Sequence, residues 1–314
     1  MKEKVLAIVG PTAVGKTKLG VELAKRLNGE VISGDSMQIY RSMDIGTAKA
    51  TEEERQGIVH HMLDIKDFHE SFSVAEFQSR VQKHIQEIQS RGRLPIIVGG
   101  TGLYIQSVLY DYRFSEATGD DELRRELEVY ATEHGNDALH RKLQEVDPQA
   151  AENIHPNNVR RVVRALEVYR TTGMTMTDYQ KQQSAQPRYQ HAIIGLTSDR
   201  EQLYERINTR VDEMVSEGLV DEVKRLYEQG LSGTQASQAI GYKEIIEAIE
   251  GKCTMEEAVE QLKQNSRRYA KRQFTWFKNK MAIEWFDLTE GDFDKKVEEI
   301  LEYIAGKLGE KSNV

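Results

Sequence analysis

The sequence predicts an α/β fold, in which a parallel sheet flanked by helices is interrupted by an inserted all-helical subdomain. Short apolar runs alternate with helical stretches near both ends of the chain, and this alternation predicts βαβ units with right-handed crossovers. Between these two parts the strand pattern disappears and only helical periodicity remains. The predicted division is a first core part at residues 1–114, a helical insertion at 115–190 and a second core part at 191–314.

Each predicted strand is a short apolar run, which is typical of strands buried on both faces of a parallel sheet. The runs lie at 5–9, 30–33, 95–98, 191–196 and 283–286. Helical stretches are predicted to about residue 28 after the first strand, at 74–89, from about 200 and from about 293. In the insertion, apolar side chains recur at helical spacing in two stripes, one at Leu123, Leu127 and Tyr130 and one at Val159, Val162, Val163 and Leu166.

The composition is that of a globular chain whose bulk charge gives no reason to expect a nucleic-acid partner. Of 314 residues, 39% are hydrophobic and 30% charged, and 51 acidic against 43 basic side chains leave a net charge of −8. Any basic surface must therefore be local. Cys253 is the single cysteine, which excludes an internal disulfide framework and fits a reducing, cytoplasmic setting. The apolar run at 5–9 is too short for a signal sequence and no later stretch approaches a membrane span, so no membrane association is expected.

A glycine-rich motif between the first strand and the first helix predicts a phosphate-binding loop. The segment matches G-x-x-x-x-G-K-[ST] in full and reads Gly10-Pro11-Thr12-Ala13-Val14-Gly15-Lys16-Thr17. Main-chain N–H groups and the helix N-terminus would hold phosphate oxygens, Lys16 would add a positive charge, and the Thr17 hydroxyl would bind Mg²⁺. The motif predicts a P-loop NTPase-like core. It does not say whether the loop holds ATP or an isoprenoid diphosphate, because both present similar oxygens.

The second predicted strand ends at Asp35, on the edge of the sheet where open α/β folds bind ligands. Two functional interpretations compete for this carboxylate. It is a Mg²⁺ ligand, as in P-loop kinases, or it is a general base. The structural alternative is a helix cap, since Asp is a good capping residue.

Arg210 is a second candidate site residue because it lies within an apolar stripe. In the helix predicted from about residue 200, Leu203, Ile207 and Met214 share one face, and Arg210 falls inside it. A guanidinium on a buried face is costly unless it meets an anion. That anion is a substrate or, in the alternative interpretation, a structural carboxylate.

Two segments of the chain are locally basic although the net charge of the protein is negative. Between residues 267 and 280 six basic residues occur with no acidic one, namely Arg267, Arg268, Lys271, Arg272, Lys278 and Lys280. The aromatic side chains of this segment (Tyr269, Phe274, Trp276, Phe277) are assigned to the core. In the insertion, Arg160, Arg161 and Arg164 lie opposite the apolar stripe. Such stripes suit a phosphate backbone, and the alternative is an ordinary solvated face.

Several blocks of this sequence resemble, in the same order, those of the tRNA dimethylallyltransferases. These blocks are DSMQIYR at 35–41, MDIGTAK at 43–49, HHMLD at 60–64, GRLPIIVGGTGLY at 92–104, IHPNN at 154–158, GYKE at 241–244 and RQFTWF at 272–277. The resemblance covers residues 5–285 and departs only at Gly34, Ala50 and Val59, none of which carries a reactive group. The zinc-finger extension of eukaryotic relatives is absent, so the resemblance is to the bacterial type.

The resemblance implies transfer of a dimethylallyl group from its diphosphate to N6 of adenosine 37, adjacent to the anticodon in tRNA. Asp35 would be the general base, and Lys16, Arg210, the loop amides and Thr17 with Mg²⁺ would stabilise the leaving diphosphate. The implied tRNA contacts are Asp35, Ser36, Met37, Gln38, Thr101, Arg124, Arg160, Arg161, Arg164, Arg267, Arg268, Lys271 and Arg272. A monomer is expected. An adenylate isopentenyltransferase, a P-loop small-molecule kinase and a non-catalytic RNA-binding protein remain alternatives.

Overall fold

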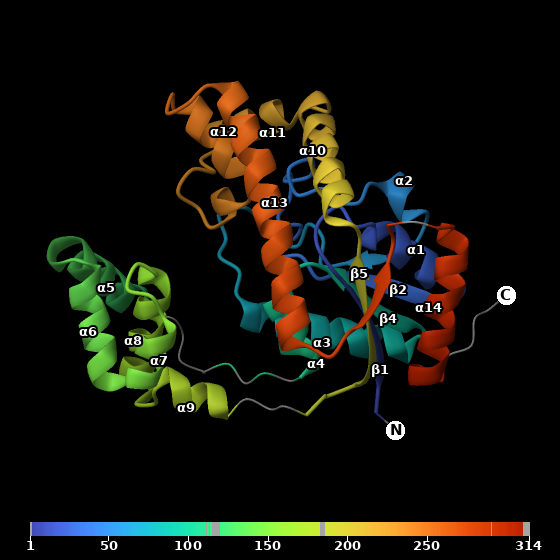
Figure 1. Cartoon of the computed structure of the whole chain (residues 1–314), viewed down its shortest axis with the longest axis horizontal. Helices are drawn as coiled ribbons and strands as arrows, with labels where there is room; N and C mark the ends of the chain where they lie inside the picture. The colour runs from blue at the N-terminus through green and yellow to red at the C-terminus, as the bar shows by residue number, and fades with distance from the viewer. Residues whose placement is uncertain are drawn as a thin grey trace. The chain divides into compact units, whose positions relative to one another are not determined.

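The computed structural model describes residues 2–110, 112, 114, 120–182, 186–289 and 291–309. The chain forms two compact units (Figure 1). Unit 1 comprises Met1–Asp111 and Pro187–Val314, and unit 2 comprises Tyr112–Gln186. In the described part of the chain, no helix is long and apolar enough to cross a bilayer.

Unit 1 is built on a six-stranded, all-parallel sheet, which confirms the predicted α/β fold class. The strand order is β3-β2-β4-β1-β5-β6, and because all neighbours are parallel, no pair can be joined by a hairpin. The strands are β1 (Lys4–Val9), β2 (Gly29–Ser33), β3 (His60–His61), β4 (Leu94–Gly99), β5 (Gln190–Thr197) and β6 (Glu284–Asp287). Gln190, at the predicted end of the insertion, is the first residue of β5 and pairs with Lys4.

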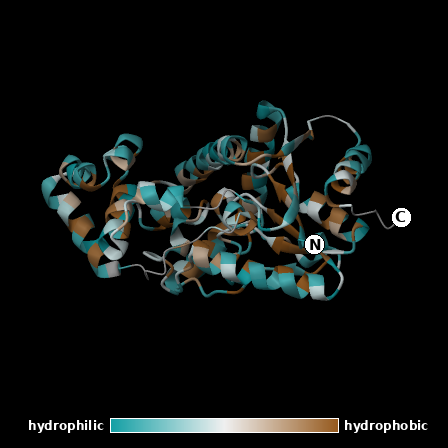
Figure 2. Ribbon diagram, turned by 90° about the horizontal axis from the view of Figure 1, so that it is seen from below, coloured by the Kyte–Doolittle hydropathy of each residue, from teal (hydrophilic) through white to brown (hydrophobic). Residues whose placement is uncertain are grey.

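Alternation along β1 divides the interior of unit 1 into two cores. Val5, Ala7 and Val9 face one core, which also contains apolar side chains of α3 (Val74–Ser90) and α4 (Gly102–Leu109). Leu6 and Ile8 face the other, together with apolar side chains of α1 (Lys16–Arg26) and α14 (Phe293–Leu308). Figure 2 shows the strands of this unit as predominantly hydrophobic and the helices with hydrophilic residues along them. Burial on both faces explains why the predicted strands are continuous apolar runs.

The helices of unit 1 begin at sequence signals that are easily recognised. Gly15 in a left-handed conformation precedes α1, Ser73 caps α3, and Thr254 forms a capping box with Glu257 at the start of α13. The helical segments are α1 (Lys16–Arg26), α2 (Glu52–Arg55), α3 (Val74–Ser90), α4 (Gly102–Leu109), α10 (Arg200–Ser216), α11 (Leu219–Glu228), η1 (Ala236–Gln238), α12 (Tyr242–Ile249), α13 (Met255–Lys280) and α14 (Phe293–Leu308).

Unit 2 contains helices α5 to α9 and, among its described residues, no strand. Its core is formed by apolar side chains of α5, α6, α7 and α8, including the predicted stripe residues Leu123, Leu127, Val162 and Leu166. The helices are α5 (Asp121–His134), α6 (Asn136–Val146), α7 (Pro148–Asn153), α8 (Val159–Thr172) and α9 (Met176–Lys181).

Candidate active site

A cavity of about 330 Å³ opens beside the phosphate loop in unit 1, where β1 and β2 end. Its lining combines the polar side chains of Asp35 and Arg210 with the apolar side chains of Ile207, Met214 and Leu262. The full lining comprises Thr12, Ala13, Asp35, Ser36, Met37, Gly46, Thr47, Ala48, Ile207, Arg210, Val211, Met214, Gln238, Ala239, Ile240, Leu262, Ser266, Tyr269 and Arg272. The cavity therefore combines a group that can take a proton, a cation and room for an apolar substituent.

The phosphate loop leads directly from β1 into α1. Gly10 has φ +148°, and a Cβ there would lie 2.7 Å from the Leu196 carbonyl oxygen, so only glycine fits. The Lys16 ammonium donates a hydrogen bond to the Pro11 carbonyl at 2.6 Å. Burial and the nearby Arg210 charge lower the pKa of Lys16 to about 7, although Asp35 acts in the opposite direction. The free loop thus holds a lysine that is ready to regain its full charge when an anion approaches.

Asp35 is half-buried in the cavity wall, and the main chain fixes one of its two carboxylate oxygens. Its Oδ1 accepts hydrogen bonds from the N–H groups of Met37 at 2.8 Å and Gln38 at 3.4 Å. No hydrogen bond engages Oδ2 within the described part of the chain. Burial raises the pKa of Asp35, and the two amides with the neighbouring cations oppose this rise without cancelling it. The carboxylate is thus oriented, with one oxygen available for chemistry.

Arg210 of α10 shares this cavity with Asp35, as the apolar stripe predicts. Its side chain is half-buried, and burial lowers the pKa of its guanidinium despite the carboxylates around it. It forms no ion pair with any carboxylate among the described residues. Arg206, one turn earlier, is exposed. The structural ion pair considered for Arg210 is therefore not seen, and the guanidinium is free to meet an anion in the cavity.

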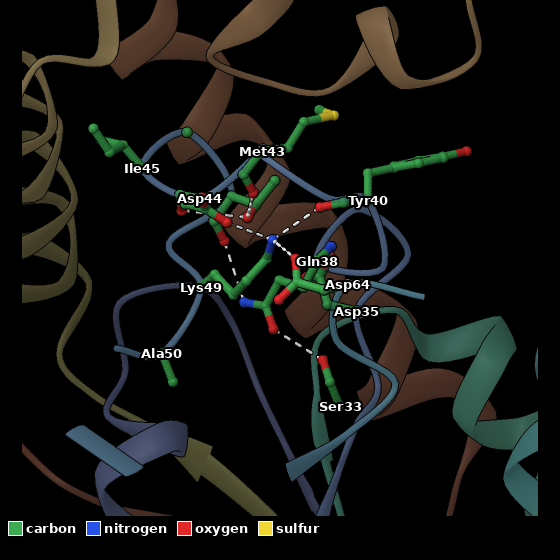
Figure 3. A network of polar contacts seen from close by, with 12 residues as sticks. Ser33, Asp35, Gln38, Tyr40, Met43, Asp44, Ile45, Lys49, Ala50 and Asp64 are labelled. Atoms are coloured by element: carbon green, nitrogen blue, oxygen red, sulfur yellow. Dashed lines mark hydrogen bonds and ion pairs between the residues drawn. The ribbon is translucent and has the colours of Figure 1, made fainter. Parts of the chain in front are cut away.

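The loop that follows Asp35 is held by a polar network (Figure 3). Gln38 accepts a hydrogen bond from the Ser33 hydroxyl at 2.9 Å and donates two to the carbonyls of Thr47 and Ala48, both at 3.2 Å. Its amide is therefore occupied within the loop, and Gln38 does not line the cavity, unlike Ser36 and Met37.

Buried Lys49 completes this network with one acceptor for each of its three protons. It donates to the Tyr40 carbonyl at 2.8 Å and to the carboxylates of Asp44 and Asp64, both at 2.6 Å (Figure 3). An ammonium that is only 4% exposed is tolerated because all its donors are used.

Thr101 connects the end of β4 to the Asp35 loop. Its hydroxyl oxygen accepts a hydrogen bond from the Ser36 N–H at 3.2 Å. Burial raises the pKa of Tyr269, on α13, to about 12, although the side chains of Thr101 and Gln273 act in the opposite direction. Tyr269 lines the cavity and Thr101 does not. Assigning Tyr269 to the core therefore missed a cavity residue.

A family model described as IPP transferase matches residues 38–280. The tRNA dimethylallyltransferase of Anoxybacillus flavithermus is 60% identical over 315 residues, which cover 100% of each protein. That of Bacillus cereus (strain AH187) is 62% identical over 312 residues, which cover 99% of this chain and 98% of the relative. The chain belongs to the IPP transferase family.

Solved structures of IPP transferases have the same fold. A full-length tRNA isopentenylpyrophosphate transferase from Bacillus halodurans is 57% identical and superposes with a TM-score of 0.76 over 98% of this chain and 97% of its own. A eukaryotic dimethylallyltransferase whose crystals show it acting on tRNA is 32% identical, with a TM-score of 0.84 over 99% of this chain and 81% of its own. The resemblance inferred from the sequence blocks is confirmed.

The basic stripe of this IPP transferase lies on α13. Arg268, Lys271, Arg272 and Lys278 are exposed, and Arg272 reaches the rim of the cavity. Arg267 is half-buried and donates a hydrogen bond to the Asn208 side chain of α10. Two of the aromatic residues behind the stripe pack inward, as predicted: Phe277 is fully buried and Phe274 lies 5.0 Å from Trp285, ring centroid to ring centroid.

The basic residues of unit 2 divide into two groups. Arg160 and Arg161 are exposed on α8. Arg164 and Arg124 instead form ion pairs with Glu167, at 2.7 and 2.9 Å. Glu167 is fully buried, and although burial opposes its ionisation, the hydrogen bonds from Arg164 and Arg124 lower its pKa overall. Part of the predicted RNA-binding set is thus engaged inside the unit.

Glu222 of α11 shapes the cavity although no sequence block contains it. Its carboxylate accepts hydrogen bonds from the N–H groups of Asp44 and Ile45 at 3.0 Å and Gly46 at 3.1 Å, and from the hydroxyl of Tyr242. It is 6% exposed and fixes the segment of the wall that contains Gly46. Glu222 could have been found from the sequence, because it is an acidic residue among the apolar stripe positions of its helix.

Proposed function

We propose that this IPP transferase moves the dimethylallyl group of dimethylallyl diphosphate to N6 of adenosine 37 in tRNA and releases diphosphate. The observation that carries the proposal is that Asp35 and Arg210 both line one cavity, which begins at the phosphate loop. A proton acceptor and an anion-binding cation are the two groups that this reaction requires.

The donor diphosphate binds the loop at 10–17. Main-chain N–H groups at the start of α1 and the Lys16 ammonium face its oxygens, and Arg210 adds a second cation from the cavity lining. As the bond between the allylic carbon and the diphosphate oxygen breaks, negative charge collects on the leaving group, and both cations stabilise it. The five-carbon chain fits the apolar wall formed by Ile207, Met214 and Leu262.

The acceptor is the exocyclic amine of adenine, a poor nucleophile because its lone pair is delocalised into the ring. Asp35 Oδ1 is held by two amides, which leaves Oδ2 to hydrogen-bond this amine and take its proton as the new C–N bond forms. Ser36 and Met37 line the same wall and contact the base. An unpaired adenosine of the anticodon loop can enter such a cavity at low cost in unstacking energy.

The donor atoms on the loop are compatible with Mg²⁺. Thr17 offers a hydroxyl, a hard oxygen ligand of the kind that Mg²⁺ prefers. Among the described residues no cluster of three or more His, Cys, Asp or Glu side chains forms a metal site, so phosphates and waters would supply most ligands of a bound Mg²⁺. Bound there, Mg²⁺ would neutralise charge on the leaving diphosphate.

The tRNA is held by its backbone. The exposed cations of α13 are Arg268, Lys271 and Arg272, of which Arg272 lines the cavity, and Arg160 and Arg161 supply positive charge on unit 2. Such contacts position a phosphate backbone without reading sequence. We assign the anticodon stem-loop as the bound part because the target base lies in it.

A transfer assay with rival acceptors tests this function. Radiolabelled dimethylallyl diphosphate is offered with an anticodon stem-loop, with AMP or with ATP, with and without Mg²⁺. We expect label only in the stem-loop RNA. Label in AMP or ATP would instead indicate an adenylate isopentenyltransferase, and ATP hydrolysis without transfer would indicate a kinase or ATPase.

A further inference from the structure

The buried face of α13 joins the two sides of the active site through one side chain, Gln273. This amide is 5% exposed. Its Oε1 accepts a hydrogen bond from the Thr12 N–H of the phosphate loop at 2.9 Å, and its Nε2 donates one to the Gly100 carbonyl, after β4, at 3.0 Å. A single planar amide therefore sets the spacing between Thr12 and Gly100.

The glycines after β4 allow this close approach. A Cβ on Gly100 would lie 2.0 Å from Gln273 Nε2, and one on Gly102 would lie 2.1 Å from the ring of Trp276. Neither glycine has a φ in the left-handed range, so close packing against α13 explains their identity. The GGTG and RQFTWF blocks, far apart in the sequence, are thus complementary surfaces of one contact.

Thr12 and Gly100, the two hydrogen-bond partners of Gln273, both lie next to residues that would contact the substrates. Thr12 belongs to the loop that holds the donor, and it lines the cavity. Gly100 precedes Thr101, whose hydroxyl oxygen accepts a hydrogen bond from the Ser36 N–H, next to Asp35. The chain of contacts runs from the phosphate loop through Gln273 to the segment that carries the proposed base.

We propose that Gln273 is a positioning residue for prenyl transfer, which keeps the donor loop and the acceptor side of the cavity in register. The inference rests on the proposed function. The reacting atoms must meet at near van der Waals distance, and a misplacement of about 1 Å costs on the order of 10²-fold in rate. An amide that both accepts and donates is required, because the Thr12 N–H needs an acceptor and the Gly100 carbonyl needs a donor.

Two substitutions separate this role from simple packing. Gln273→Met keeps the length of the side chain and removes both hydrogen bonds. Gln273→Glu keeps the acceptor for Thr12 but, when ionised, has no proton for Gly100. For both variants we expect kcat at saturating substrates to fall by about 10- to 100-fold, while the KM for stem-loop RNA and for dimethylallyl diphosphate changes by less than about threefold. The exposed Gln264→Met on the same helix is the matched control and is expected to leave kcat unchanged.

The Gln273→Glu variant has a further signature that packing does not predict. A protonated carboxyl group has one donor and one acceptor, as the amide does, so it can restore both hydrogen bonds. The ratio of variant to wild-type kcat should therefore rise as pH falls, whereas the same ratio for Gln273→Met should stay flat. Using the ratio removes the pH dependence of the wild-type reaction.

Any of four results would overturn the inference if wild-type transfer is normal. Folded Gln273→Met could have a kcat near the wild-type value, or the substitutions could change only the KM for dimethylallyl diphosphate. The ratio of Gln273→Glu to wild-type kcat could be independent of pH, or both variants could fail to fold, which would make Gln273 a stability residue. Circular dichroism and thermal melting establish folding in each case. Absence of transfer by the wild-type protein would instead refute the proposed function.

Discussion

Arg210 of unit 1 and Arg164 of unit 2 were both expected to meet phosphate groups, but the two units place them in opposite environments. Arg210 is half-buried beside a cavity and has no ion-pair partner among the described residues. Arg164 is 44% exposed and pairs with a fully buried carboxylate, Glu167. Both arginines were predicted to bind phosphate from their positions on amphipathic helices. The structure distinguishes them, because only Arg164 has a carboxylate partner among the described residues.

The difference shows what makes a cation available to a substrate. The charge of an arginine paired with Glu167 is already compensated by a charge-assisted hydrogen bond, and breaking that bond to bind RNA would leave a buried carboxylate less well compensated. Arg210 has no such bond to lose, and an incoming diphosphate relieves the cost of its burial. We therefore propose that catalysis takes place in the cavity of unit 1. Glu167 and its ion-pair partners Arg164 and Arg124 instead stabilise the fold of unit 2.

The largest effect is expected at Asp35. Replacing it with Ala should lower kcat by roughly two to four decades, the usual size of a general-base contribution, and leave RNA and donor affinity nearly unchanged. Single-turnover transfer and binding titrations measure the two separately. Collapse of donor binding with substantial residual turnover would mean that Asp35 is a metal ligand and not the base.

The pH dependence of the wild-type reaction sharpens this test. A general base acts in its deprotonated form, and burial raises the pKa of Asp35. As pH falls, kcat should therefore decline at a higher pH than for an ordinary exposed carboxylate, with a limiting slope of about one decade per pH unit. Asp35→Ala should lack this acid limb. An identical limb in the variant would assign it to another group.

The next largest effect is expected at Arg210. Arg210→Gln should reduce turnover by about 10²- to 10³-fold, with a much smaller change in RNA affinity, because it removes charge stabilisation of the leaving group. Arg210→Lys should recover only part of this loss, since an ammonium cannot present two parallel donors. The exposed Arg206→Gln, one turn earlier on α10, is the matched control. Normal kinetics for a folded Arg210→Gln would return this residue to a structural role.

A smaller effect than those at Asp35 and Arg210 is expected from Lys16, which should make the affinity for the donor depend on pH. Its pKa in the free protein is about 7, and a bound diphosphate raises it. Binding above this pH therefore takes up a proton, and donor affinity should fall by at most about tenfold per pH unit as the pH rises. Calorimetry in buffers of different ionisation enthalpy measures the uptake at pH 8. Lys16→Met should abolish it, and the exposed Lys18→Met should preserve it. Equal uptake in Lys16→Met would assign the proton to another group.

Features that depend on a local sequence pattern could be predicted. The apolar run at 5–9 predicted β1, the glycine-rich motif predicted the loop between β1 and α1, and the apolar stripe of α10 singled out Arg210, which lines the cavity. β3 was missed because it has two residues, both histidines, and hence no apolar run. The roles assigned to Asp35, Thr17 and the RNA-binding residues remain predictions.

Residues that act through distant contacts could not be predicted in the same way. Gln273 lies 261 residues from Thr12 and 173 from Gly100, and no periodicity connects them. Glu167 and Glu222 were accessible in principle, because each acidic side chain interrupts the apolar stripe of its helix, as Arg210 does. Their partners still required the structure. The loop that contains Gly46 is fixed by Glu222 through backbone amides, which have no sequence signature.

The smallest effect is expected on the surface of unit 2, where the exposed and the paired arginines can be compared directly. With a net charge of −8, the protein as a whole repels RNA, so local cations must supply the attraction. Each phosphate neutralised adds about 0.7 to 0.9 to the slope of log affinity against log salt. Arg160→Ala with Arg161→Ala should therefore flatten the slope by up to about two such increments, with little change in turnover at saturating RNA.

Arg164→Ala is the counterpart within the same helix. Because its guanidinium is paired with Glu167, its removal should leave the salt slope nearly unchanged and instead lower the stability of unit 2, by about 1–3 kcal/mol, through the buried carboxylate it leaves partly unpaired. RNA affinity at several salt concentrations and hydrogen exchange across α5 and α8 measure the two effects. If Arg164→Ala flattened the slope as much as the double variant, the ion pair with Glu167 would open when RNA binds, and the contrast with Arg210 would not hold. If neither variant changed the slope, unit 2 would not contact the RNA backbone through α8, and the cations of α13 would have to supply the whole attraction.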